Sequence, residues 1–471
     1  MSSASTSRFI RACLRQPVDR TPVWFLRQAG RYMPEYMAVR KHHSLLDICR
    51  TPALAAEVTI TAAERLGVDA AIIFADLLLP LTPMGLDFEF VNGEGPVIHH
   101  PLRTLDQIRA LRTDRTPELS YVAEAITKVA AHFNNRASAS SSAVASRALK
   151  GTGFSPAPAL KGTSSPLKGT GFSPAPSLKG ASSALKGTGF SPSVPPTPGS
   201  GALAPEGIFP ENQDTLGIIG FCGAPFTLAS YMIEGGSSRN YIETKKLMYA
   251  SSTSGPRPSA LGPEPGAPRL DSETWARGRD TNAASWPLLM QKLVDVLADF
   301  AAQQVEAGAD VIQVFDSWAG ALSVADYRAY ALAPTTELIR RIQALGVPVI
   351  YFGVDTASLL PTFRETGADV IGLDWRIPLD AGWRAVGHNT AVQGNLDPIT
   401  LFAPDDVLEA RVREILSLAA GRPGHIFNLG HGIVPNTPVG SVVRVVDLIK
   451  RHAHTTPHAS NEATSDWAIR A

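Results

Sequence analysis

Arg27 and Arg31 lie close together in the segment RQAGR, and Arg40 follows a short distance along the chain. Arginine is the side chain best suited to grip a carboxylate, because its planar fork donates two parallel hydrogen bonds. Several arginines at the end of one strand therefore indicate a ligand that carries several carboxylates. The alternative is that they form salt bridges at the rim of the fold, and their spacing leaves both interpretations open.

Asp76 ends the apolar run AAIIFAD and is followed by three leucines. A carboxylate in such surroundings can accept hydrogen bonds from ligand N–H groups or stabilise a positive charge that develops during a reaction. The alternative is that Asp76 only caps the loop that follows the run. The residue type and position are compatible with both roles.

Three further polar residues occupy similar positions after apolar runs. Tyr231 follows the small-residue turn in GFCGAPFTLASY, and a lone tyrosine in that place is commonly a packing residue. Ser317 is either a hydrogen-bond donor to a ligand or the N-cap of the next helix. His431 stands between two glycines in NLGHG, where an accessible imidazole favours a functional role.

Eight short apolar runs could position these side chains. They read as strands buried on both faces, and helical patterns separate most of them. The phrases LGVDAAIIFAD, AGADVIQVFD and TGADVIGLD repeat one helix-to-strand joint, with a glycine that ends the helix and an aspartate before the strand. The predicted strands are 22–28, 70–77, 216–221, 310–317, 348–354, 369–374, 391–396 and 425–432.

Repeated βα units predict an α/β fold, a (β/α)8 TIM barrel that forms a single domain. An open doubly wound sheet is the alternative, but no GxGxxG loop follows any predicted strand. In a barrel, chemistry is located at the carboxyl ends of the strands. That rule brings all the residues named above to one mouth.

Two low-complexity stretches interrupt the barrel sequence. Residues 137–205 contain no acidic side chain and repeat the unit LKGTGFSPAP with a period of 18 residues. Each repeat offers a single large apolar side chain, so we predict a disordered insertion rather than a solenoid. Residues 250–285 predict a Pro- and Gly-rich loop insertion. The barrel domain then comprises 1–136, 206–249 and 286–455, and 456–471 form a C-terminal tail.

The charge balance excludes some partners. Lys and Arg total 43, as do Asp and Glu, in 471 residues. A net charge of zero argues against nucleic-acid binding and against a basic membrane surface, and no apolar run is long enough for a membrane span. Three scattered cysteines predict neither disulfides nor a zinc site, and favour a reducing, cytoplasmic location. The basic N-terminus has the composition of a transit peptide, but its apolar spacing favours a helix of the folded body.

The segments RQPVDRTPVWFLRQAGRYMPEY, GFCGAPFTLASYMIEGG, QVFDSWAG, VQGNLDP and FNLGHGIVPNTP, in this order, resemble the uroporphyrinogen decarboxylase family. The resemblance covers nearly all of the chain outside the two insertions. It implies a (β/α)8 barrel that removes the carboxyl groups of the four acetate side chains of uroporphyrinogen III and yields coproporphyrinogen III. It also implies that no metal or organic cofactor is used, that the protein forms a homodimer, and that it acts in haem biosynthesis.

The resemblance assigns roles to individual residues. Asp76 faces the pyrrole N–H groups, and Arg27 binds a carboxylate and is a candidate proton donor. The residues expected to contact substrate are Arg27, Gln28, Ala29, Gly30, Arg31, Asp76, Tyr231, Ser317 and His431. Phe315 is expected to pack against the macrocycle, and Arg40 is a weaker member of the basic cluster.

Two other functions fit the same barrel. A corrinoid-dependent or thiol methyltransferase would bind zinc through a His-x-Cys pair, but no histidine precedes Cys13, Cys49 or Cys222 by two residues. A non-catalytic binding protein that uses the insertions as an interaction platform is the second alternative. The presence of every site segment in one chain argues against it.

Overall fold

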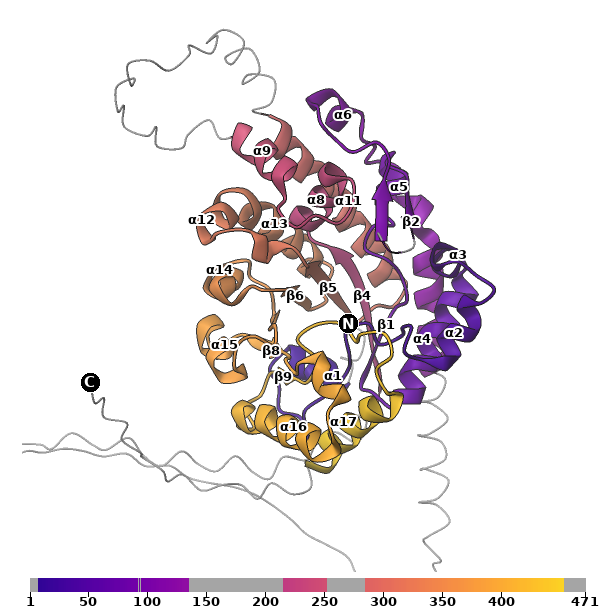
Figure 1. The fold of residues 1–471 in the computed structure, drawn as a ribbon, viewed down its shortest axis with the longest axis vertical. Coiled ribbons are helices and arrows are strands. Elements are labelled where there is room, and N and C mark those ends of the chain that lie inside the picture. Colours follow the sequence, from indigo (N-terminus) through magenta and orange to yellow (C-terminus); the bar gives the residue numbers. More distant parts are fainter. Residues whose placement is uncertain (1–6, 92, 94, 135–214, 252–283, 453–471) are drawn as a thin grey trace, which may run out of the picture. The chain divides into compact units, whose positions relative to one another are not determined.

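Parallel strands occupy the centre of the molecule and helices surround them (Figure 1). The computed structural model describes residues 7–91, 93, 95–134, 215–251 and 284–452. Its main sheet has seven strands in the order β1-β4-β5-β6-β7-β8-β9, and every neighbouring pair is parallel. The strands are β1 (Ala70–Ile72), β4 (Gly217–Gly223), β5 (Val311–Asp316), β6 (Val349–Gly353), β7 (Val370–Gly372), β8 (Ala391–Gln393) and β9 (His425–Ile426).

The segment that begins at Pro22 fills the eighth position and closes the sheet into a ring. On one side, the Phe427 N–H donates to the Pro22 oxygen at 2.8 Å, and the Trp24 N–H donates to the Phe427 oxygen at 3.3 Å. On the other side, the Asp69 N–H donates to the Val23 oxygen at 2.8 Å. The predicted (β/α)8 barrel is therefore confirmed, although the predicted strand 22–28 is wrong in extent, because only a bridge at Val23 forms.

Helices connect the strands and form the outer ring (Figure 1). Helix α4 begins at Pro52, directly after Thr51, and Gly67 is its C-cap at φ 66°. A π-helical turn at Tyr327–Ala331 separates α12 from α13. The helices are α1 (Arg8–Cys13), α2 (Pro34–Arg40), α3 (Leu45–Arg50), α4 (Pro52–Leu66), α5 (Leu81–Met84), α6 (Leu105–Ala110), residues 120–134, α8 (Pro225–Glu234), α9 (Ile242–Ala250), α11 (Ser285–Glu306), α12 (Val324–Asp326), α13 (Leu332–Gln343), α14 (Leu360–Glu365), α15 (Leu379–Val386), α16 (Asp405–Ala419) and α17 (Val439–His452).

Smaller elements lie in the loops. Strands β2 (Phe88–Val91) and β3 (Gly95–Ile98) form an antiparallel hairpin, and Val97 bridges to Gly236 just after α8. Short 3-10 turns are found at Thr116–Leu119, Ala319–Ala321, Ala357–Leu359 and Pro398–Phe402.

The recurring Gly-x-Asp joint has one structural function at all three places. The aspartate precedes a strand, and one of its carboxylate oxygens accepts the backbone N–H of the neighbouring strand position. Asp69 accepts from Val23 at 2.8 Å. Asp310 accepts from Ile218 and Asp369 from Val349, both at 2.9 Å. Each joint thus ties a strand to its predecessor at the amino-terminal end of the barrel, leaving the opposite end for chemistry.

Helix α1 covers that amino-terminal end, as expected for a helix of the folded body. It contacts β4, β8 and β9, and Phe9 and Cys13 are buried. Gly217, the first residue of β4, is required by this packing. A Cβ atom there would lie 2.6 Å from the Phe9 ring.

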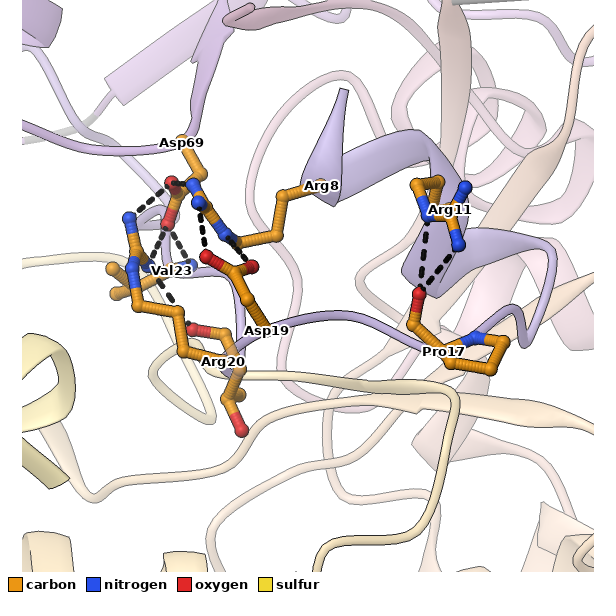
Figure 2. Close-up of polar contacts among 8 residues, drawn as sticks. Arg8, Arg11, Pro17, Asp19, Arg20, Val23 and Asp69 are labelled. Atoms are coloured by element: carbon orange, nitrogen blue, oxygen red, sulfur yellow. Dashed lines mark hydrogen bonds and ion pairs between the residues drawn. The ribbon is translucent and has the colours of Figure 1, made fainter. Parts of the chain in front are cut away.

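An ion cluster around the buried Arg8 and Asp69 holds α1 against the barrel (Figure 2). Arg8 forms two hydrogen bonds with Asp19, at 2.5 and 2.6 Å, and a third with Asp69 at 3.0 Å. Arg20 donates to both oxygens of Asp69 at 2.7 Å. The carboxylate of Asp69, which also anchors Val23, is therefore fully compensated despite its burial.

The predicted insertions lie mostly outside the described residues. This applies to 137–205, to the tail 456–471, and to 250–285 apart from its ends. Helix α9 extends through Ala250, and α11 begins at Ser285.

Candidate active site

The loops that follow β1, β5 and β9, and helix α8 after β4, carry the predicted site residues to the carboxyl end of the barrel. Parallel strands present all these loops at the same edge, so residues that are distant in sequence meet there. Arg27 belongs to the same group, because it follows the segment that occupies the eighth strand position.

Arg27 sits in a turn that is fixed by the loop after β9. The Leu26 N–H donates to Asn428 Oδ1 at 2.9 Å, and the Leu26 oxygen accepts the Ile433 N–H at 2.9 Å. Arg27 itself adopts the left-handed conformation, with φ 57°. Such a conformation is uncommon for a residue with a side chain and persists only when its surroundings impose it. The turn directs an exposed guanidinium group to the mouth.

The two glycines that flank His431 each make room for a neighbour. A Cβ at Gly430 would lie 2.7 Å from Trp375 Cβ, and one at Gly432 would lie 2.6 Å from Arg27 Cγ. The loop after β9 is therefore packed between the loop after β7 and the Arg27 turn. The pattern Gly-His-Gly reflects close packing rather than flexibility.

His431 is partly buried beside the edge of Trp375, with ring centroids 5.9 Å apart. Burial lowers its pKa, and the charges of Arg27 and Arg376 lower it further, against the opposing influence of Asp374. The imidazole is consequently neutral near pH 7. It can offer one N–H donor and one acceptor without adding charge.

Asp76 follows β1, and its Oδ1 accepts the Leu78 N–H at 2.9 Å. Desolvation raises the pKa of Asp76, whereas this hydrogen bond and the charge of Arg27 lower it. Part of its surface remains exposed. The carboxylate is thus weakly solvated yet accessible, a setting in which an approaching cation or N–H donor is bound strongly.

Tyr231 on α8 stacks against Trp318, with ring centroids 3.8 Å apart and an interplanar angle of 31°. Burial and the charge of Asp76 raise the pKa of Tyr231 to about 12, against the influence of Arg27. The Tyr231 hydroxyl is therefore neutral near pH 7, and the charges of Asp76 and Arg27 shift its pKa in opposite directions. The structure brings four predicted residues together, because Arg27 lies near enough for its charge to lower the pKa of Asp76, of Tyr231 and of His431.

Ser317 and Phe315 lie at the end of β5. Ser317 is partly exposed, directly before Trp318. Phe315 is also partly exposed and meets Phe221 and Phe352 edge to face, with ring centroids 5.6 and 6.2 Å apart. These phenylalanines place an apolar layer inside the barrel beneath the mouth.

The buried carboxylate of Asp316 supports the stacked pair of Tyr231 and Trp318. Asp316 is fully buried and accepts the hydroxyls of Thr227 at 2.6 Å and Tyr351 at 2.7 Å. Thr227 Oγ1 in turn accepts the backbone N–H of Trp318 at 3.2 Å. Desolvation raises the pKa of Asp316 to about 6. Its contacts suit a residue that positions Trp318.

The other residues of RQAGR occupy different environments. Gln28 is buried, and its Oε1 accepts the Phe25 N–H at 3.4 Å, so its side chain supports the turn. Ala29 and Gly30 are partly exposed and Arg31 is exposed. The charge of Arg31 lowers the pKa of Tyr36, against the larger effect of burial.

Arg40 lies beside Tyr36. It donates a hydrogen bond to the His43 carbonyl, and its charge lowers the pKa of the Tyr36 hydroxyl against the larger effect of burial. Tyr36 packs on Phe74, two residues before Asp76, with ring centroids 5.3 Å apart. Arg40 therefore helps to hold the edge of the site.

Two features of the described residues bear on metals and membranes. Within 7–91, 93, 95–134, 215–251 and 284–452, no group of three or more His, Cys, Asp or Glu side chains is placed to hold a metal ion. None of the helices in these ranges combines the length and hydropathy needed to cross a membrane. Cys13, Cys49 and Cys222 are buried free thiols.

Sequence reasoning missed three contributors to the site: Trp318, Trp375 and Arg376. Trp318 follows Ser317 directly, but its stacking partner comes from another βα unit. Trp375 and Arg376 directly follow Asp374 at a predicted strand end, and this position is the sequence signal that could have identified them.

Comparisons with known proteins agree with this geometry. The family model described as "Uroporphyrinogen decarboxylase (URO-D)" matches residues 4–149, 207–257 and 265–452. The uroporphyrinogen decarboxylase of Koribacter versatilis is 48% identical over 452 residues, which cover 96% of this chain and 97% of the relative. The one from Solibacter usitatus is 42% identical and covers 94% and 97%, respectively.

Among solved structures, a methyltransferase from Methanosarcina mazei matches with a TM-score of 0.57 at 15% identity, covering 96% of this chain and 99% of that one. Identity at that level supports the shared barrel fold and no shared activity. The match to the family model and the extended identity to its members lead to one conclusion. This chain belongs to the uroporphyrinogen decarboxylase family.

Proposed function

We propose that this protein decarboxylates the four acetate side chains of uroporphyrinogen III to methyl groups, giving coproporphyrinogen III in porphyrin biosynthesis. The observation that carries the proposal is the convergence of Arg27, Asp76, Tyr231 and His431 at one mouth of the barrel. A guanidinium group, a desolvated carboxylate and two neutral donors suit a ligand that carries both carboxylates and N–H groups.

The substrate supplies its own electron sink. Protonation of a pyrrole at the α-carbon next to the acetate-bearing position creates a cation close to the departing carboxylate. The bond to the carboxyl carbon then breaks, its electrons neutralise the cation, and carbon dioxide leaves. A proton added to the resulting methylene forms the methyl group, and loss of the ring proton restores the pyrrole. This sequence requires neither a metal nor an organic cofactor.

Asp76 stabilises the cation in this scheme. Its carboxylate accepts the pyrrole N–H groups, and the positive charge that develops on the ring strengthens this interaction at the moment of reaction. The weak solvation that raises the pKa of Asp76 also increases the benefit of a nearby cation.

Arg27 binds a substrate carboxylate and is the candidate proton donor, while Arg31, Tyr231, Ser317 and His431 contact the remaining carboxylates or border the macrocycle. The backbone of Gln28, Ala29 and Gly30 lines the same side. Phe315 packs against the macrocycle. We further propose that the protein acts as a homodimer in the cytoplasm, with neither nucleic acid nor membrane as a partner.

A product assay tests the proposed function. Purified protein is incubated anaerobically with freshly reduced uroporphyrinogen III, and the oxidised porphyrins are separated by their number of carboxyl groups. We expect products with seven, six, five and four carboxyl groups without added metal or cofactor. Unchanged eight-carboxyl porphyrin from a folded sample would contradict the proposal.

Asp76→Asn tests the central role in the same assay. The amide keeps the shape of the side chain but removes its charge, so we expect the fold to be retained and turnover to fall by about 100-fold, as when a group that stabilises transition-state charge is lost. Far-ultraviolet circular dichroism is the control for folding. Near-normal turnover by folded Asp76→Asn protein would exclude the role.

A further inference from the structure

Arg376 projects from the loop after β7, at the same end of the barrel as Arg27. The loop is anchored by Asp374, whose buried carboxylate accepts the N–H groups of Asp355 and Arg376, both at 2.8 Å. Nη1 of Arg376 also donates to Asp374. Asn395 Nδ2 donates to the Asp374 carbonyl at 2.9 Å. The backbone that presents Arg376 is therefore held from several sides.

The guanidinium group of Arg376 is also held in place. Its central carbon lies 3.8 Å from the centre of the Trp375 ring, a close cation–π contact. Trp375 is fixed in turn by Gly430, which packs directly on its backbone. Even so, 44% of the Arg376 side chain is exposed. A pre-ordered, accessible arginine loses little entropy on binding a carboxylate.

Arg376 and Arg27 flank His431. The loop 430–432 packs on Trp375 through Gly430 and on Arg27 through Gly432. The charges of both arginines lower the pKa of the imidazole. Two accessible cations and a neutral donor thus stand on three adjoining loops, a spread that suits a flat ligand with carboxylates around its perimeter.

We propose that Arg376 binds a peripheral carboxylate of the tetrapyrrole and so extends the substrate-binding surface beyond Arg27 and His431. This inference rests on the proposed function. The competing explanation is that Arg376 only neutralises Asp374. That explanation accounts for one of its guanidinium nitrogens but gives no reason for the exposed stack on Trp375.

Binding of oxidised porphyrins, measured by fluorescence quenching, tests the inference without requiring turnover. We expect Arg376→Gln to weaken the binding of uroporphyrin about tenfold, while Arg376→Lys loses less because it keeps the charge. Arg384→Gln is the matched control. Arg384 is an exposed arginine on α15 that pairs with Asp380, so its loss changes the net charge equally. We expect no change in its affinity.

The carboxylate is either an acetate or a propionate, and coproporphyrin separates the two because it retains only propionates. Weakened binding of both porphyrins by Arg376→Gln identifies a propionate, and weakened binding of uroporphyrin alone identifies an acetate. Unchanged affinity for both, or an equal loss in Arg384→Gln, overturns the inference. In that case turnover by the unaltered protein would still support the proposed function.

Discussion

Gly432→Ala is expected to disable the site through steric pressure on Arg27. The added Cβ would lie 2.6 Å from Arg27 Cγ and 2.9 Å from its Nε. Carbon atoms prefer separations near 3.5 Å or more, so the groups must part by about 1 Å. The hydrogen bonds at Leu26 hold the backbone of the turn, and the Arg27 side chain must therefore rotate.

Rotation near the base of the side chain moves its charged end further still. A misplacement of about 1 Å in a reacting group reduces the rate by about 100-fold, so we expect that loss in kcat/KM, equivalent to about 2.7 kcal/mol. Overpacking should also lower the free energy of unfolding by about 2 kcal/mol. Anaerobic product analysis measures the first quantity and urea unfolding the second.

Two comparisons isolate the cause. Gly440→Ala, in α17, adds a Cβ that meets no atom within 4 Å, so it should leave turnover unchanged. In an Arg27→Ala background the side chain that clashes is gone, so adding Gly432→Ala should cause no further loss. Near-normal turnover in Gly432→Ala, or losses that multiply in the double variant, would refute the reasoning.

Three other perturbations have defined outcomes. Asp69→Asn removes the shared carboxylate partner of Arg8 and Arg20, and should lower the free energy of unfolding, measured in urea, by about 3 kcal/mol. Arg384→Gln breaks an exposed ion pair and should lower the free energy of unfolding by less than about 1 kcal/mol. Asp316 has a pKa raised from 3.8 to about 6, so its protonated form favours the folded state. Relative to Asp316→Asn, the parent protein should lose about 3 kcal/mol of stability as pH rises through that window, and a flat difference between pH 4 and 6 would contradict this. Deletion of 137–205 should leave turnover unchanged, since the stretch has little apolar surface to bury; loss of activity in the product assay would show that it docks on the barrel.

Much of the fold was predictable because its signals are local. An apolar run, a helix-ending glycine and a following aspartate all lie within one short stretch, so seven strand positions followed from the sequence. The segment that begins at Pro22 was overextended for the same reason. Its apolar run continues past the point where Leu26 turns away to pair with Asn428, a partner 402 positions distant.

The site was predictable as a set of strand-end residues but not as an arrangement. Apolar and polar patterning places Asp76 and His431 at one mouth. The stack of Tyr231 on Trp318 and that of Arg376 on Trp375 depend on side-chain directions, which spacing along the chain does not encode. The ion cluster of Arg8, Asp19 and Asp69 likewise joins residues with no shared local pattern.

The ring of strands closes at Val23, which is bridged to Phe427. Val23 lies near the start of the chain and Phe427 near its end, so the ring cannot close until the segment around Phe427 is in place. The same late segment supplies Asn428, which sets the turn of Arg27. A chain that ends before Phe427 therefore lacks both the pairing that closes the ring and the Asn428 contact that sets the Arg27 turn.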